Sequence, residues 1–200
     1  MFFSAFVSAS LGYIFGSVPF GLVFTRLSGL GDIRKIGSGN IGATNVLRTG
    51  RKDLAFLTLV FDIGKAGLVA LLCTFLYASS TMGFIAGTAA VIGHNYPIWL
   101  KFKGGKGVAS TLGLMFIMTP LVGILTAMTW LAMAVSFRYS SLSALTALML
   151  SPLYAAIYEG PIPAVFYAGL AVLSFWRHKD NIKRLIKGEE TKINLKKKVK

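Results

Sequence analysis

Long apolar stretches alternate with short polar ones along most of the 200-residue chain. The apolar runs lie at roughly 2–24, 54–78, 82–99, 107–119, 121–137, 141–158 and 161–176. A helix of about 20 apolar residues is long enough to cross the hydrocarbon core of a bilayer. The pattern therefore predicts an all-α, polytopic membrane protein with seven transmembrane helices.

One of these predicted helices is short. The stretch 107–119 reads GVASTLGLMFIMT, and as a helix it would rise only about 20 Å. The hydrocarbon core is about 30 Å thick. We therefore expect this helix to tilt little, to begin within the headgroups, or to enter the membrane only part way.

Basic residues gather in alternate connections between the apolar runs. The connections rich in Lys and Arg are 25–53, 100–106, 138–140 and 177–200. The other connections, near 79–81, 119–120 and 159–160, hold no Lys or Arg, and their only charge is Glu159. Because Lys and Arg mark the cytoplasmic side, the N-terminus is predicted outside and the C-terminus inside. A six-helix alternative that omits 107–119 would place basic loops on both sides of the membrane.

Composition narrows the class of protein further. Hydrophobic residues make up 54% of the chain and charged residues 14%, while the formal net charge is +14. A basic balance is typical of proteins that bind nucleic acid or anionic membranes. Here the basic residues are confined to gaps between membrane-length segments, which excludes a nucleic-acid partner. The single cysteine, Cys73, lies inside an apolar run and excludes a disulfide framework.

The three stretches least typical of membrane sequence all fall on the predicted cytoplasmic side. They are GSGNIGATNVLR (37–48), GHNYPIWLKFKGGKGVAS (93–110) and RHKDNIKRLIKGEE (177–190), here called motifs 1, 2 and 3. Each combines basic residues with glycines or amides. Glycines let backbone N–H groups approach a phosphate closely. The motifs therefore predict anion binding at the inner face of the membrane.

Two soluble phosphate-binding motifs are excluded. Gly37, Gly39 and Gly42 satisfy GxGxxG, but no strand precedes them and no acidic residue follows about 20 positions on, as a dinucleotide site requires. The stretch KGGKGVAS resembles a Walker loop. However, Lys106 is followed by Gly107 where that loop needs the Mg²⁺-binding Ser or Thr.

Two basic side chains are the strongest candidates for phosphate binding. Lys106 follows two glycines at the mouth of the short helix, and the alternative is that its ammonium only extends toward lipid headgroups. Arg48 ends motif 1, and a planar guanidinium can hold a phosphate through two hydrogen bonds. The alternative for Arg48 is a simple marker of the cytoplasmic side.

Uncharged groups beside these cations complete the candidate site. The predicted backbone contacts come from Gly39, Gly42, Gly104 and Gly105, and the side-chain hydrogen bonds come from Ser38, Asn40, Thr44 and Asn45. Turn and cap chemistry is the alternative role for these side chains.

Three titratable residues outside these positions are assigned structural roles. His94 is interpreted as packing or capping the inner end of its helix, with catalysis as the alternative. Asp62 and Lys65 lie about three turns into the second predicted helix, and their i, i+3 spacing predicts a structural ion pair, with a functional role as the alternative.

The order GSGNIGATN, then GH..P..L.FKGGKGVA, then RH..NI.RL..G.E closely resembles the bacterial acyl-phosphate:glycerol-3-phosphate acyltransferase family. The resemblance covers nearly the whole chain. It implies transfer of a fatty acyl group from acyl phosphate to the 1-hydroxyl of sn-glycerol 3-phosphate. The products would be lysophosphatidic acid and phosphate, formed without a cofactor or metal as a step of phospholipid synthesis.

The resemblance also implies roles for residues and a location. It makes His178 and Asn181 part of the glycerol-phosphate site, with a structural role as the alternative for the histidine, and places Ser141 and Ser143 near the donor phosphate, with ordinary helix serines as the alternative. Together with the residue chemistry above, it leads us to predict Lys106, His178 and Ser38 as catalytic and Arg48 and Asn181 as substrate-binding. It implies a single membrane domain over 1–182, followed by a basic cytoplasmic tail over 183–200. The protein would lie in the bacterial cytoplasmic membrane, in contact with lipid, and its active site would face the cytoplasm. The sequence is compatible with a monomer.

The sequence lacks the motifs of acyltransferases and hydrolases that use a catalytic His–Asp pair or a nucleophilic serine. The sequence has no HxxxxD motif and no GxSxG serine, and Cys73 is not placed as a nucleophile. We therefore expect direct attack by the acceptor hydroxyl. Acyl phosphate itself carries a group that can take the proton, so His178 is predicted to position glycerol phosphate and not to serve as an obligatory base.

Two further functions remain as alternatives. A small permease for phosphate-bearing anions would use the same basic face, although no inverted repeat of broken helices is visible. A polybasic membrane scaffold would account for the tail from Lys183 onward. A scaffold leaves the three glycine-rich and amide-rich motifs unexplained.

Overall fold

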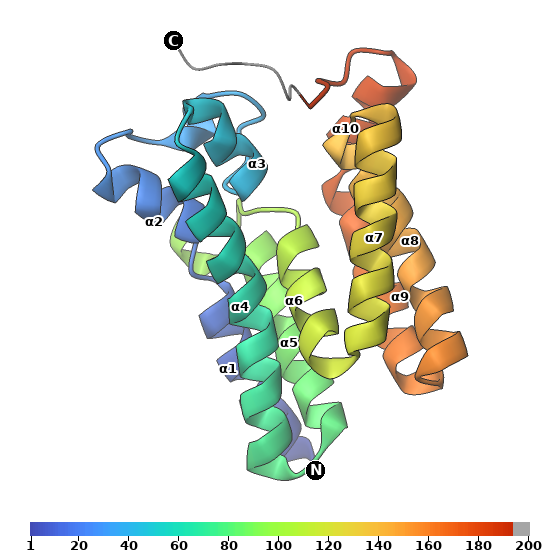
Figure 1. The fold of residues 1–200 in the computed structure, drawn as a ribbon. Coiled ribbons are helices and arrows are strands. Elements are labelled where there is room, and N and C mark those ends of the chain that lie inside the picture. The colour runs from blue at the N-terminus through green and yellow to red at the C-terminus, as the bar shows by residue number, and fades with distance from the viewer. Residues whose placement is uncertain (194–200) are drawn as a thin grey trace. The chain divides into compact units, whose positions relative to one another are not determined.

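The computed structural model describes residues 1–193. Over this range the chain forms ten α-helices and three short 3₁₀ turns, with no β-strand, which confirms the all-α prediction. The helices pack into two compact units, one of residues 1–118 and one that begins at Thr119 (Figure 1). The single domain predicted for 1–182 stays a prediction.

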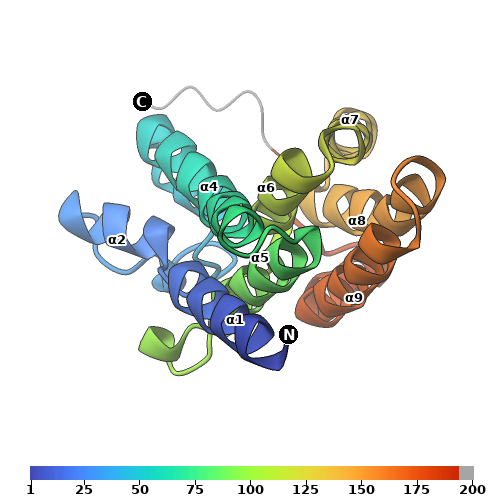
Figure 2. The ribbon, with the colours of Figure 1, turned by 90° about the horizontal axis from the view of Figure 1, so that it is seen from below.

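The first unit is built around α5. Its α-helices are α1 (Phe2–Gly16), α2 (Phe20–Leu27), α3 (Ala43–Val46), α4 (Lys52–Tyr77), α5 (Ser80–Asn95) and α6 (Val108–Met118). Its 3₁₀ turns are η1 (Ile33–Lys35), η2 (Leu47–Thr49) and η3 (Ile98–Leu100). Helices α1, α4 and α6 all pack against α5, and α4 also packs against α6 (Figure 2).

The first apolar run is not one continuous helix, as 2–24 was predicted to be. Helix α1 ends at Gly16, and α2 begins at Phe20 after Pro19. Proline lacks the N–H needed inside a helix and disfavours helical backbone at the residue before it. The chain therefore turns at 17–19, and α2 leaves the direction of α1 (Figure 1).

Small residues let the helices of this unit approach closely. A Cβ added at Gly12 or Gly16 of α1 would overlap the backbone of Ala86 or Ala90 in α5. A Cβ at Gly113 of α6 would overlap the backbone of α4 in the same way. Such contacts are typical of helices packed in a membrane, where dispersion rather than water exclusion drives association.

The second unit contains three long helices and one short one. They are α7 (Pro120–Phe137), α8 (Ser140–Tyr158), α9 (Pro161–Arg177) and α10 (Lys179–Ile186). Helix α8 packs against both α7 and α9. After α10 the chain returns to the start of α8, where the Ile193 N–H donates to the Arg138 carbonyl at 2.6 Å. This return brings the end of motif 3 next to α8.

Four helical segments are long and apolar enough to cross a membrane: Phe2–Leu27, which is interrupted at 17–19, Lys52–Tyr77, Pro120–Phe137 and Ser140–Tyr158. Two shorter apolar helices are Val108–Met118 and Pro161–Arg177. The 11 residues of α6 rise about 16 Å, roughly half the hydrocarbon core. The count of seven spans and the orientation of the termini stay predictions.

Candidate active site

Motif 1 forms a loop organised by one buried amide. The side chain of Asn45 is 1% exposed. Its Oδ1 accepts a hydrogen bond from the Ser38 backbone N–H at 3.1 Å, and its Nδ2 donates to the carbonyls of Ile33 and Asn40, each at 2.8 Å. Asn45 therefore holds the loop together, which is the structural role that its residue type also allowed.

The other candidate side chains of motif 1 lie nearer the surface. Ser38 and Thr44 are exposed, whereas Asn40 is half-buried and its Oδ1 accepts from the Ile41 N–H at 2.8 Å. Gly39 has a φ of 70°, a left-handed conformation that favours glycine, and Gly42 is the N-cap of α3. Ser38 and Thr44 are thus placed where a ligand could reach them.

Arg48 lies against the same loop. A Cβ built on Gly37 would come within 2.7 Å of the Arg48 Nη1, so this guanidinium passes directly over the glycine. Arg48 is exposed and has no acidic partner among residues 1–193. Its charge is therefore not neutralised by the described part of the chain.

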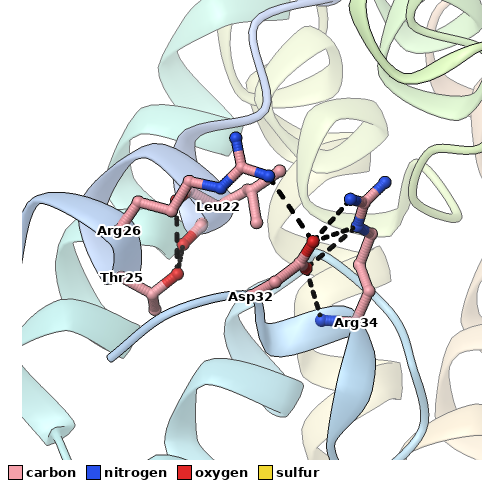
Figure 3. A network of polar contacts seen from close by, with 6 residues as sticks. Leu22, Thr25, Arg26, Asp32 and Arg34 are labelled. Atoms are coloured by element: carbon pink, nitrogen blue, oxygen red, sulfur yellow. Dashed lines mark hydrogen bonds and ion pairs between the residues drawn. The ribbon is translucent and has the colours of Figure 1, made fainter. Parts of the chain in front are cut away.

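Neighbouring arginines are paired. Asp32 accepts from the Arg34 Nε at 2.9 Å and lies 3.5 Å from the Arg26 guanidinium (Figure 3). Hydrogen bonds from the Arg34 side chain hold the pKa of the Asp32 carboxyl well below its usual range. These two arginines stabilise the loop before motif 1, in contrast to Arg48.

Motif 2 contains a glycine loop whose amides are already paired. The Gly104 N–H donates to the Asn95 carbonyl at 3.2 Å, and the Gly105 N–H donates to the His94 carbonyl at 2.9 Å. A Cβ at either glycine would overlap atoms of His94. These glycines thus allow close packing on the end of α5, whereas the sequence suggested that their N–H groups face a phosphate. Their assignment as substrate-binding residues stays a prediction.

Lys106 directly follows this loop and is half-buried. Gly107 comes next with a φ of 78°, and α6 starts at Val108. The backbone around Lys106 is therefore held between the end of α5 and the start of α6.

Motifs 1 and 2 meet through an apolar cluster. Buried side chains of Leu22, Ile33, Val46, Leu54 and Ala55 form the cluster. Leu100 of motif 2 packs against it, and Val46 belongs to motif 1. The first unit therefore brings both motifs to one end of the helices.

The predicted Asp62–Lys65 pair is confirmed. The Lys65 Nζ lies 2.8 Å from the Asp62 Oδ1, and both residues are buried. The same Nζ lies 2.7 Å from the His94 Nδ1. His94, which was interpreted as a packing residue of α5, thus joins the pair.

Motif 3 places His178 at the N-cap of α10 and Asn181 in its first turn, as the helical spacing predicted. The His178 Nδ1 lies 2.8 Å from the Ser174 carbonyl oxygen, which can only accept a hydrogen bond. The proton of a neutral ring therefore sits on Nδ1. Its Nε2 then carries the lone pair and is a hydrogen-bond acceptor. His178 is buried, with 3% of its surface exposed.

Glu190 holds the polar groups of motif 3 and α8 together. Its Oε1 accepts from the Ser141 hydroxyl at 2.7 Å and from the Asn181 Nδ2 at 2.6 Å, and its Oε2 accepts from the Arg184 Nε at 2.7 Å. Burial raises the pKa of this carboxyl, but the three hydrogen bonds outweigh burial and lower it overall. Glu190 was not predicted as a site residue, although it is the final residue of the RH..NI.RL..G.E pattern.

Ser143 behaves differently from Ser141. Its hydroxyl donates to the Tyr139 carbonyl in the previous turn of α8 at 2.8 Å. Ser143 is fully buried, with 0% of its surface exposed. In this arrangement Ser141 contacts an anionic group, whereas Ser143 bonds to its own helix.

Comparison with known proteins identifies the chain's relatives. The sequence model of the family described as "Glycerol-3-phosphate acyltransferase" matches residues 6–188. This chain belongs to the glycerol-3-phosphate acyltransferase family. A glycerol-3-phosphate acyltransferase of Rhodospirillum rubrum is 56% identical, with 96% of this chain and 92% of the relative covered. One of Paramagnetospirillum magneticum is 58% identical, with 96% of each chain covered.

Solved structures show the same fold. Crystal structures of PlsY (YgiH), an integral membrane glycerol 3-phosphate acyltransferase, match with TM-scores of 0.89 and 0.88. They represent its glycerol 3-phosphate form and its lysophosphatidic acid form, and each is 35% identical with 96% of both chains covered. With its membrane-length helices, this acyltransferase family member is an integral membrane protein.

The candidate residues of this acyltransferase fall in both units. The first unit holds Ser38, Arg48 and Lys106, and the second holds His178 and Asn181. Within residues 1–193, no group of three or more His, Cys, Asp and Glu side chains is placed to hold a metal ion. The roles in catalysis and binding stay predictions. The last part of the predicted basic tail, 194–200, lies outside the described residues.

Proposed function

We propose that this protein transfers a fatty acyl group from acyl phosphate to the 1-hydroxyl of sn-glycerol 3-phosphate. The observation that carries the proposal is the match along 96% of the chain to the acyltransferase in its glycerol 3-phosphate form. All three motifs lie within the matched family region, residues 6–188, except the last two residues of motif 3.

The proposed reaction balances without a covalent enzyme intermediate. The acceptor hydroxyl oxygen bonds to the acyl carbon, and the bond from that carbon to the phosphate oxygen breaks. The hydroxyl proton goes to the departing phosphate, so the products are lysophosphatidic acid and inorganic phosphate. The enzyme then contributes by orienting two anions and stabilising the charge that shifts onto the leaving phosphate.

Three observations support residue roles in this reaction. Arg48 is exposed beside the glycines of motif 1 and has no acidic partner in the described chain, which suits a phosphate. Ser141 and Asn181 already hold the Glu190 carboxylate, so their geometry suits an anionic oxygen. The His178 Nε2 suits a hydroxyl donor, because Nδ1 is turned to Ser174.

We further propose that seven helices span a bacterial cytoplasmic membrane, with the N-terminus outside and the active site facing the cytoplasm. The support is the absence of Lys and Arg from 79–81, 119–120 and 159–160. Cysteines at Lys103 and Glu159, two exposed positions, test this in a Cys73→Ala background. An impermeant thiol reagent should modify Lys103→Cys only from the cytoplasmic side and Glu159→Cys only from outside. Labelling of both from one side refutes the topology.

The activity test uses purified protein in detergent. With acyl phosphate and labelled glycerol 3-phosphate, we expect labelled lysophosphatidic acid in the absence of any sealed compartment. Acyl-CoA in place of acyl phosphate should give none, because its thioester carries no phosphate at the reacting carbon. Efficient turnover of acyl-CoA would reject the donor. A permease would give no product with either donor.

A further inference from the structure

A charged pair lies deep inside the first unit. Asp62 and Lys65 of α4 are 3% and 6% exposed, and their charged atoms lie 2.8 Å apart. Taking charges out of water costs several kcal/mol per ion, which only a close pairing such as this one offsets. Ionisable residues within membrane segments are therefore usually retained for a function. The reaction proposed above uses neither residue.

The Lys65 ammonium has three close polar neighbours, of which Asp62 is an ion-pair partner and the other two are hydrogen-bond partners. Lys65 Nζ lies 2.8 Å from the Asp62 Oδ1, 2.7 Å from the His94 Nδ1 and 3.2 Å from the Val18 carbonyl oxygen. These acceptors belong to α4, to α5 and to the break between α1 and α2. Lys65 thus ties three parts of the first unit to one point.

This contact fixes the tautomer of His94. An ammonium donates hydrogen bonds and cannot accept them, so the His94 Nδ1 accepts and the neutral ring carries its proton on Nε2. The Nε2 edge faces the glycine loop, because a Cβ at Gly105 would overlap this atom. The carbonyl of His94 also accepts the Gly105 N–H at 2.9 Å. His94 therefore contacts the loop through both its ring and its backbone.

We propose that Asp62, Lys65 and His94 are positioning residues that set the place of Gly104–Gly105 and, through it, of Lys106. Asp62 holds Lys65, Lys65 holds the His94 ring, and the ring and carbonyl of His94 hold the loop. The proposal rests on the proposed function, since it assigns Lys106 a phosphate contact. The three residues act through the loop without touching substrate.

Two variants separate positioning from plain structural support. In Asp62→Leu/Lys65→Met both charges are replaced by apolar groups, a change that often leaves stability unaltered or improved. In His94→Asn, the amide oxygen can still accept from Lys65, but no ring reaches Gly105. Neither variant leaves an unpaired buried charge, so each should fold with a melting temperature close to that of the wild type.

The readout is steady-state kinetics in detergent, with and without Lys106→Ala. With Lys106 present, each variant should lower kcat/KM for glycerol 3-phosphate at least about tenfold, because a small displacement of a catalytic contact is costly. In the Lys106→Ala background the same changes should add less than about threefold, since the contact they position is already gone. Additive losses, or wild-type kcat/KM in the double variant, would overturn the proposal.

A readout independent of turnover distinguishes this proposal from the proposed function. Lys103→Cys in the Cys73→Ala background reports loop position through its rate of reaction with a soluble thiol reagent. We expect Asp62→Leu/Lys65→Met to change that rate by more than about threefold, as the loop loses its anchor. An unchanged rate overturns the positioning network. Failure of the wild type to form lysophosphatidic acid refutes only the reaction. If the double variant does not fold, His94→Asn alone decides through both readouts.

Discussion

The chain has two histidines, and their surroundings fix opposite proton positions. In the first unit, the His94 Nδ1 faces the Lys65 ammonium and accepts a hydrogen bond at 2.7 Å. In the second unit, the His178 Nδ1 faces the Ser174 carbonyl and donates one at 2.8 Å. Neutral His94 therefore carries its proton on Nε2, whereas neutral His178 carries it on Nδ1.

The two tautomers favour different proposed roles for the two histidines. In the proposed reaction the Nε2 of neutral His178 would accept from the hydroxyl of glycerol 3-phosphate, whereas the Nε2 of neutral His94 can only donate. In each histidine the tautomer is set by the partner of Nδ1, which is the Lys65 ammonium for His94 and the Ser174 carbonyl for His178. These tautomers agree with the loop-positioning role proposed for His94 and the substrate-positioning role proposed for His178.

Breaking the buried pair near His94 should have the largest effect. Asp62→Asn removes one charge and leaves the Lys65 ammonium buried without its counter-ion. We expect a loss of about 3–5 kcal/mol in the free energy of unfolding. Thermal unfolding in detergent measures it, with Asp53→Asn at the exposed start of α4 as the control. An equal loss of unfolding free energy in Asp62→Asn and Asp53→Asn would contradict the prediction that burial makes the loss of the counter-ion costly.

Removing a charge that is proposed to bind phosphate should lower activity without unfolding the protein. For Lys106→Ala and Arg48→Ala we expect kcat/KM to fall about 10²-fold, as a charge-assisted hydrogen bond contributes roughly 1.5–3 kcal/mol. Arg51→Ala is the matched control for Arg48, because Arg51 is exposed and paired with Asp53 at 2.6 Å. A loss for Arg51→Ala as large as that for Arg48→Ala would reject the assignment.

Replacing the second histidine tests whether it is a base. If His178 positions glycerol 3-phosphate, His178→Gln should lower kcat about tenfold and leave the pH dependence of the rate unchanged. An obligatory base would instead give a loss of at least about 10³ in kcat, together with loss of a pH limb near the imidazole pKa. Lys179→Gln, at the exposed next position, should behave as wild type.

The smallest effect should come from Glu190 and should depend on pH. The pKa of this carboxyl is lowered in the folded protein, so the ionised form favours folding. Its contribution should be complete above its ordinary value of 4.5 and should disappear as the pH falls through the lowered value. Glu190→Gln should therefore cost about 1–2 kcal/mol near pH 7 and less in acid.

Thermal unfolding at several pH values measures this difference. Glu189→Gln is the matched control, because Glu189 is exposed and its backbone N–H bonds to the Arg184 carbonyl whatever its side chain is. A pH-independent loss in Glu190→Gln would show that the hydrogen bonds of the amide, and not the charge of the carboxylate, decide the stability of this segment.

The sequence alone predicted the helices, the buried ion pair and the family, because each of these depends on residues that are close together in the chain. Membrane-length apolar runs predicted the helices, and the i, i+3 spacing predicted the Asp62–Lys65 pair. The same spacing put His178 and Asn181 on one turn of α10. The order of the three motifs identified the family, because long motifs seldom agree by chance.

Contacts between residues far apart in the chain needed the three-dimensional fold. Residue types alone did not show that Lys65 meets His94, that the amides of Gly104 and Gly105 bond to the end of α5, or that Glu190 meets Ser141. Lys65 and His94 are 29 residues apart, the two glycines and their partners 9 and 11, and Ser141 and Glu190 49. None of these separations is the three or four residues of a helix turn, so no local pattern predicts the contacts. Helix periodicity places a side chain on a face of its own helix, whereas the neighbour it meets, and thus the tautomer of each histidine, depends on how the helices pack.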